Sequence, residues 1–127
     1  MTIYKRIAAV LAAIVLGLGG VLVVSSPAAA APPGGCTNSS VCGYAADQYA
    51  RNEGYETIPN SGAGVCENVG LPNRWTSVYN NSGRTIKLYK NVNCGNGVWT
   101  LASGGSLRNM ALYQPSWNDN IESFRFV

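Results

Sequence analysis

The sequence predicts an all-β fold in which two similar units pack against each other. Short runs rich in tyrosine, valine, threonine, tryptophan and isoleucine alternate with glycine, asparagine, serine and proline, which is typical of many short strands. Beyond the first 35 residues, no stretch keeps a sustained 3.6-residue apolar period, so long helices are not expected. A faint internal repeat divides this part of the chain into two halves.

The repeat relates short segments of the two halves. Residues 41–44 (Val-Cys-Gly-Tyr) resemble residues 86–89 (Ile-Lys-Leu-Tyr) at an offset of 45, and residues 74–78 resemble residues 120–124 at an offset of 46. We therefore expect each half to form one four-stranded unit. Packing two such units together buries apolar faces that neither unit could bury alone.

The clearest strands lie in the middle of the chain. Residues 75–80 and residues 84–90 are joined by Asn81-Ser82-Gly83, and Ile86 and Leu88 alternate with polar residues in the second run. This pattern predicts a β-hairpin.

Two further turns and a closing strand follow. Asn96-Gly97 predicts a tight turn before a strand at residues 98–101, and residues 103–106 (Ser-Gly-Gly-Ser) predict another turn. In residues 121–127, Phe124 and Phe126 share one face while Arg125 points the other way, so we expect a final strand there.

The N-terminus has the three-part layout of a secretory signal. Lys5 and Arg6 precede an apolar block at residues 7–24, and small residues follow at 25–31. A membrane anchor is the alternative, but the glycines within the block and the Ala-x-Ala pattern after it favour cleavage after Ala30. The predicted organisation is a signal peptide at 1–30, a flexible leader at 31–35 and one domain at 36–127.

Cleavage changes the charge balance. Two of the nine basic residues leave with the signal and all six acidic residues stay, so seven minus six gives a mature net charge of +1. Neither nucleic acid nor a membrane is therefore expected as a partner of the mature protein.

Four cysteines lie in the mature part, an even number that predicts two disulfides in an oxidising compartment: Cys36, Cys42, Cys66 and Cys94. Zinc is the alternative. The chain has no histidine and its cysteine spacings lack a Cys-x-x-Cys pair, so zinc is disfavoured.

Residues 84–97 read Arg-Thr-Ile-Lys-Leu-Tyr-Lys-Asn-Val-Asn-Cys-Gly-Asn-Gly. This tract carries a resemblance to the βγ-crystallin superfamily. Residues 84–97 resemble its Greek-key segment, with Cys94 where an aromatic residue usually stands. Each half also ends in a segment similar to the superfamily's calcium motif, Asn/Asp-Asn/Asp-x-x-Ser/Thr-Ser. Residues 72–77 read Pro-Asn-Arg-Trp-Thr-Ser, and residues 118–123 read Asn-Asp-Asn-Ile-Glu-Ser. The resemblance implies two Greek-key motifs that form a βγ-crystallin-like sandwich.

Within the superfamily, the chain resembles the secreted actinomycete branch of peptidase inhibitors, typified by a metalloproteinase inhibitor. The features that carry this likeness are the signal peptide, the Cys36-x5-Cys42 opening, residues 75–85 and the final Asn-Asp-x-Ile-x-Ser. The resemblance implies a secreted monomer that inhibits an extracellular peptidase, and it implies a Cys36–Cys42 disulfide, which leaves Cys66 to pair with Cys94.

The reactive residues of that inhibitor do not carry over, because this chain lacks the short disulfide-closed loop with a Cys-Val pair. Residues 60–73 form a long connection, and such loops are often functional. We expect a contact segment there, with small and branched apolar side chains that suit a metalloproteinase pocket; its candidate residues are Val65, Cys66, Val69 and Leu71.

Calcium is the candidate cofactor. In the superfamily each site takes ligands from both motif copies, which implies as ligands Asn73, Thr76, Asn118, Asp119 and Ser123. Pro72 replaces a side-chain ligand in the first copy and Glu122 replaces a hydroxyl in the second, so we expect a single weak site. The alternative to inhibition is therefore a calcium-binding or structural extracellular protein, including a killer-toxin-like one.

Catalysis is not expected. Without histidine, Ser-His and Cys-His nucleophile systems are excluded, and none of the six carboxylates lies in a recognisable motif. These carboxylates are interpreted as solvated surface groups, and the tryptophans as packing residues rather than a carbohydrate-binding surface.

Overall fold

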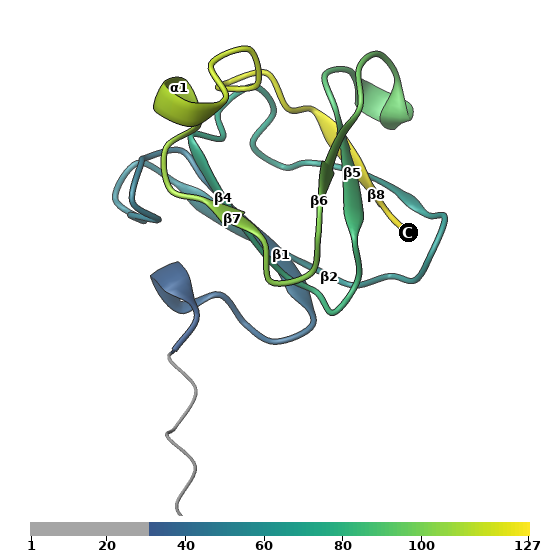
Figure 1. The fold of residues 1–127 in the computed structure, drawn as a ribbon, viewed down its shortest axis with the longest axis horizontal. Coiled ribbons are helices and arrows are strands. Elements are labelled where there is room, and N and C mark those ends of the chain that lie inside the picture. Colours follow the sequence, from purple (N-terminus) through teal and green to yellow (C-terminus); the bar gives the residue numbers. More distant parts are fainter. Residues whose placement is uncertain (1–30) are drawn as a thin grey trace, which may run out of the picture.

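The computed structural model describes residues 31–127, so the predicted signal peptide at 1–30 lies outside the described residues. In the described part, eight strands form two four-stranded antiparallel sheets (Figure 1). The strands of the first sheet, in spatial order, are β2 (Tyr55–Pro59), β1 (Ser40–Tyr44), β4 (Ser77–Asn81) and β7 (Ser106–Leu107). Those of the second sheet are β3 (Cys66–Asn68), β8 (Ser123–Phe126), β5 (Ile86–Tyr89) and β6 (Trp99–Leu101). The predicted all-β fold is confirmed.

Each sheet combines three strands of one half of the chain with one strand of the other half. The first sheet holds β1, β2 and β4 with β7, and the second holds β5, β6 and β8 with β3. The repeat is therefore real, since β1 and β4 occupy the places that β5 and β8 occupy in the other half. Each half supplies four strands as expected, but the four strands of one half do not share one sheet, because β3 and β7 each cover an edge of the other half's sheet.

The predicted hairpin at residues 75–90 does not form. Its two strands belong to different sheets: β4 pairs with β1 and β7, and β5 pairs with β6 and β8. Asn80 holds the crossing, because its buried Nδ2 donates to the carbonyl oxygens of Arg84 (2.8 Å), Leu101 (3.0 Å) and Ala102 (3.0 Å). A short polar turn can therefore connect two strands of different sheets as well as two strands of one hairpin.

The other local predictions are confirmed. Asn96 and Gly97 have positive φ angles of 52° and 71°, as a tight turn requires. In β8, Phe124 and Phe126 are fully buried between the sheets, whereas Arg125 on the opposite face is partly exposed.

The core centres on Trp75, the largest fully buried side chain among the described residues. Its ring covers the backbone of Gly43, where an added Cβ would lie 1.9 Å from Trp75 Cε2. The Trp75 Nε1 donates to Glu56 Oε1 at 2.7 Å, and the same carboxylate accepts from the backbone N–H groups of Gly70 (2.6 Å) and Leu71 (3.0 Å). Glu56 is thus not a solvated surface group. It joins β2 to the segment that follows β3.

Three short helical turns complete the described part of the chain: η1 (Pro33–Gly35), η2 (Val92–Cys94) and α1 (Met110–Tyr113). The four residues of α1 are too few to show a helical period in the sequence. The Asn109 side chain caps α1 by accepting from Leu112 N, and Met110 is fully buried. Within residues 31–127, no helix is long and apolar enough to cross a membrane.

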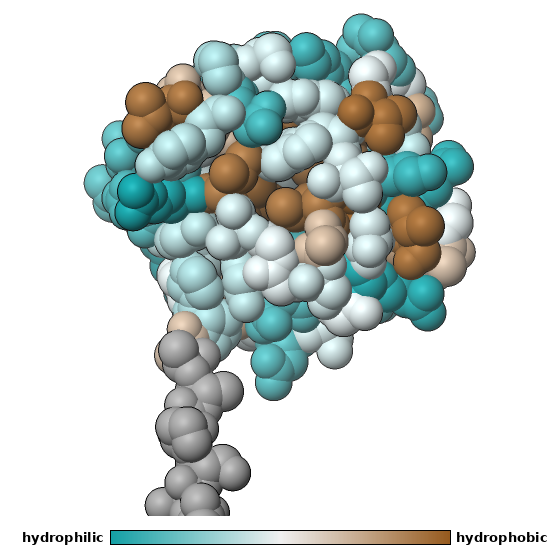
Figure 2. All heavy atoms as spheres, in the orientation of Figure 1, coloured by the Kyte–Doolittle hydropathy of each residue, from teal (hydrophilic) through white to brown (hydrophobic). Residues whose placement is uncertain are grey.

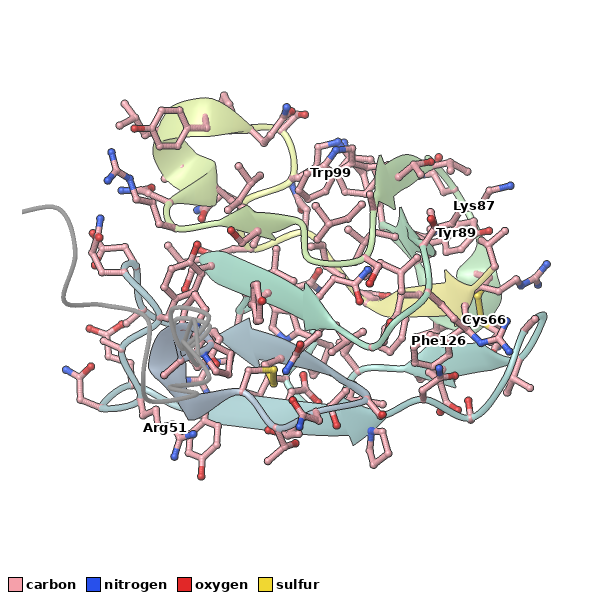
Figure 3. All side chains as sticks on the ribbon, turned by 60° about the horizontal axis from the view of Figure 1, so that its bottom comes forward. Arg51, Cys66, Lys87, Tyr89, Trp99 and Phe126 are labelled. Carbon is pink, nitrogen blue, oxygen red and sulfur yellow. A yellow bond between two sulfur atoms is a disulfide. The ribbon has the colours of Figure 1, made fainter. Side chains whose placement is uncertain are left out.

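The structure contains the two disulfides that the resemblance implied. Cys36 pairs with Cys42, and Cys66 on β3 pairs with Cys94 in η2. Figure 3 shows Cys66 beside the strand that carries Phe126, far from the end of the molecule where Arg51 lies.

The segment predicted as a leader lies against the domain. Arg51 donates from Nε to Gly34 O (2.8 Å) and from Nη2 to Gly35 O (3.1 Å), and the Tyr44 hydroxyl donates to Pro33 O (3.2 Å).

On the face in Figure 2, apolar residues lie in scattered patches between polar ones.

Candidate functional site

The two calcium-motif copies meet at one end of the sandwich, and each contributes to two symmetric contacts. The second residue of one copy faces the fifth residue of the other. Asn73 Nδ2 donates to Glu122 Oε1 (2.6 Å), and the Thr76 hydroxyl donates to Asp119 Oδ1 (3.3 Å). We call these pairs the Asn73–Glu122 site and the Thr76–Asp119 site.

Reciprocal backbone bonds hold the two copies together. Asn73 N donates to Ile121 O (3.0 Å), and Asp119 N donates to Trp75 O (3.1 Å). Both Asn73 and Asp119 are left-handed, with φ angles of 56° and 53°. Asparagine and aspartate tolerate this conformation better than most residues, which explains why the motif places them there.

The last serine of each copy has a structural role. Ser123 is fully buried, its hydroxyl donates to Asn91 O, and it accepts from Cys94 N (2.9 Å). Ser77 makes the equivalent bonds, to Ala46 O (2.7 Å) and from Tyr49 N (3.2 Å). Ser123 was expected to be a calcium ligand, but its oxygen is already used to anchor the loop between β5 and β6.

The Asn73–Glu122 site is satisfied by the protein's own donors. Besides the bond from Asn73, the Glu122 carboxylate accepts from Val92 N at 3.0 Å. Both carboxylate oxygens therefore already accept from N–H groups. A cation at this site would have to compete with those donors for the Glu122 oxygens.

The Thr76–Asp119 site is more open. A hollow of about 170 Å³ lies beside it and is lined by Ala45, Glu53, Asn73, Arg74 and Asp119. Asn118 donates from Nδ2 to Asp119 Oδ2 (3.2 Å), while its Oδ1 is buried without a hydrogen-bond partner among residues 31–127. A carboxylate, a hydroxyl and an unengaged amide oxygen are the kinds of ligand that a hard cation prefers.

Two features limit this donor set. In the described part of the chain, no three histidine, cysteine, aspartate or glutamate side chains are grouped to hold a metal ion. The Arg74 guanidinium also lines the hollow and donates from Nη2 to Glu53 O at 2.7 Å. Calcium here would rely on few charged ligands, so the residues fit only a weak site.

The residues expected to contact a peptidase are not presented together. Val69 is buried in the core, Leu71 packs against the core, and Cys66 is a β3 residue tied to Cys94. Val65 is 43% exposed. The segment expected as a long loop is thus divided by β3 into a connection at residues 60–65 and a second one after Asn68.

Two residues outside the hollow have shifted pKa values. Burial raises the pKa of Tyr44 above its ordinary value, an effect that the nearby Arg51 opposes. A hydrogen bond to Tyr113 raises the pKa of Arg108. Neither residue lines the hollow.

Sequence reasoning missed three residues that shape these sites. Glu122 stands where the motif has a hydroxyl, and its carboxylate accepts hydrogen bonds from Asn73 Nδ2 and Val92 N in the Asn73–Glu122 site. Glu53 and Arg74 come to the hollow from outside the motif's ligand positions, so no spacing in the sequence indicates them.

The fold resembles solved βγ-crystallin domains. One belongs to a study of the evolution of the eye lens βγ-crystallin domain fold, with a TM-score of 0.54 at 16% identity, covering 72% of this chain and 87% of that chain. The N-terminal domain of Protein S gives 0.51 at 15% identity, covering 69% and 94%. A βγ-crystallin domain from Clostridium beijerinckii gives 0.50 at 18% identity, covering 68% and 95%.

No protein-family model matches the chain, and no curated protein matches it either. At these identities the structural likeness establishes the βγ-crystallin-like fold, which confirms the predicted architecture. Function has to be argued from the site.

Proposed function

We propose that the mature chain is an extracellular, non-enzymatic protein that binds one calcium ion weakly at the Thr76–Asp119 site. The observation that carries the proposal is the contact between the Thr76 hydroxyl and the Asp119 carboxylate, because Asp119 also lines an open hollow. Thr76 and Asp119 would hold the ion, and Glu53, which lines the hollow together with Asp119, would add charge.

The proposal allows one ion, not two. The Asn73–Glu122 site already offers two N–H groups to its carboxylate, so a cation there would first have to displace both donors. A site with few charged ligands should have a dissociation constant of about 10⁻⁴ to 10⁻³ M, as extracellular modules do.

Isothermal titration of the purified mature chain with CaCl2 tests the proposal. We expect one binding event for the wild type and none for Asp119→Asn. Asp47→Asn, which removes the same charge from an exposed residue outside the hollow, should bind as the wild type does. Two submicromolar sites, or equal binding by Asp119→Asn, would contradict the proposal.

Peptidase inhibition is a second candidate, favoured by the way residues 60–65 are held. Asn60 is fixed by bonds from its backbone N to Ser39 O (2.8 Å) and from its Nδ2 to Ser82 O (3.1 Å). Gly64 N donates to Phe126 O (2.8 Å) beside the C-terminal strand (Figure 1). A loop pinned at both ends loses little entropy when a protease binds it.

Small side chains and the exposed Val65 suit an apolar metalloproteinase pocket, and the loop offers no lysine or arginine to a trypsin-like pocket. Residues 31–127 should therefore slow a thermolysin-like enzyme and leave trypsin unaffected. Val65→Asp should abolish the effect, whereas Val98→Asp, at another exposed valine, should not. If neither enzyme slows at micromolar concentrations, the chain is not an inhibitor of these classes.

A further inference from the structure

Arg74 brings a permanent positive charge into the hollow beside Asp119. Arg74 lines the hollow together with Glu53 and Asp119, and its Nη2 donates to the carbonyl oxygen of Glu53 at 2.7 Å. The residue is exposed, so the side chain is free to leave this position.

The other motif copy has no such charge. The residue that corresponds to Arg74 at the offset of 46 is Asn120, whose Nδ2 donates to Ser116 O at 3.1 Å. The symmetric relation between the copies therefore does not require an arginine at this position. Its placement is a feature of the Thr76–Asp119 site alone.

We propose that Arg74 acts as a built-in competitor of calcium at the Thr76–Asp119 site, which rests on the proposed calcium function. The guanidinium is a cation that only donates hydrogen bonds, so it repels a metal cation and cannot ligate one. Its charge also neutralises part of the attraction that Glu53 and Asp119 would exert on a divalent ion.

A second effect works through the carbonyl oxygen of Glu53. Calcium commonly takes backbone carbonyl oxygens as ligands, and this one is occupied by the Arg74 N–H. A calcium ion that also used this oxygen as a ligand would have to compete with Arg74 for it. In the absence of calcium, Arg74 itself ties the motif loop to the loop before β2.

Three variants of the mature chain test this role by calcium titration and by the melting temperature with and without CaCl2. Arg74→Gln should bind calcium at least about tenfold more tightly than the wild type, equivalent to about 1.4 kcal/mol. Arg74→Lys keeps the charge and should stay within about threefold of the wild type. Arg84→Gln removes the same charge from an exposed residue that does not line the hollow, and it should not alter the affinity.

The melting temperature gives an independent readout, because at a fixed ligand concentration the stabilisation of the folded state increases with the logarithm of the affinity. Saturating calcium should raise the melting temperature of Arg74→Gln more than that of the wild type. Far-ultraviolet circular dichroism should show the same fold for every variant before calcium is added.

The outcomes separate the two proposals. If the wild type binds calcium and Arg74→Gln binds it no better, Arg74 is not a competitor and the calcium function stands. If only Arg74→Gln binds, the competitor role stands and the wild type is not a calcium-binding protein. If neither binds calcium, both proposals are wrong.

Discussion

Replacing Gly43 with alanine should severely destabilise the domain, because Trp75 occupies the space that the new methyl group needs. The added Cβ would lie 1.9 Å from Trp75 Cε2, 2.3 Å from Nε1 and 2.4 Å from Cδ2, whereas ordinary contacts begin at 3.4 Å. The ring would have to retreat by about 1.5 Å, the difference between 3.4 and 1.9 Å.

The surroundings of Trp75 resist that movement. The side chain is fully buried, and its Nε1 is bonded to Glu56 at 2.7 Å. Overpacking usually costs about 1 to 3 kcal/mol. Here a fixed methyl group meets a fixed ring and also strains a hydrogen bond, so we expect a loss of about 3 to 5 kcal/mol. For a domain of this size, that loss lowers the melting temperature by more than about 12 °C.

Thermal unfolding followed by circular dichroism measures the effect. Gly95→Ala is the matched control, because Gly95 has an ordinary φ of −95° and its added Cβ would meet no atom closer than 3.5 Å. The control should melt with the wild type or slightly above it. Adding Trp75→Leu to Gly43→Ala should cost less than the sum of the two single losses, by at least about 1 kcal/mol. A melting temperature for Gly43→Ala within a few degrees of the wild type would refute the packing argument.

Three further outcomes are expected. Asn80→Asp replaces a donor that faces three carbonyl oxygens with a buried carboxylate, so urea unfolding should show a loss of more than about 3 kcal/mol; an unchanged midpoint would contradict the role of Asn80 in the crossing. Because burial raises the pKa of Tyr44, the folded state favours the neutral phenol, so stability should be complete below pH 10.0 and decline as the pH rises through and beyond it. Tyr44→Phe should weaken this alkaline decline in urea titrations at several pH values, and an equal decline would assign it to other groups. Replacing Cys66 and Cys94 together by serine should lower the free energy of unfolding by about 3 to 4 kcal/mol in the entropy model, and a loss below about 1 kcal/mol would be evidence against it.

The strands could be predicted because their signals are local. Alternation around Ile86 and Leu88 and the shared face of Phe124 and Phe126 follow from the two-residue period of a strand. The partner of each strand could not be predicted in the same way. The three polar residues after Asn80 suit a hairpin as well as a crossing between sheets, and only the buried contacts of Asn80 distinguish the two.

The candidate site was predictable only in outline. The motif resemblance identified Asn73, Thr76 and Asp119, and these residues lie in two adjoining loops. Asn73 contacts Glu122, whereas Thr76 contacts Asp119. This pairing depends on how the two halves are oriented, and local sequence patterns do not determine that orientation. The burial of Ser123 and the approach of Arg74 are likewise consequences of tertiary packing.

β3 and β7 each join the sheet formed by the other half of the chain, and this exchange affects how the chain folds. A half by itself would hold a three-stranded sheet with a bare edge and one strand with no sheet to join. Most repeat proteins unfold unit by unit, because each unit contacts only its neighbours. This chain should instead unfold in a single cooperative step, with equal free energies from probes placed in either half. Cutting the chain between residues 82 and 83 should give two fragments that are unfolded apart and regain structure only when mixed.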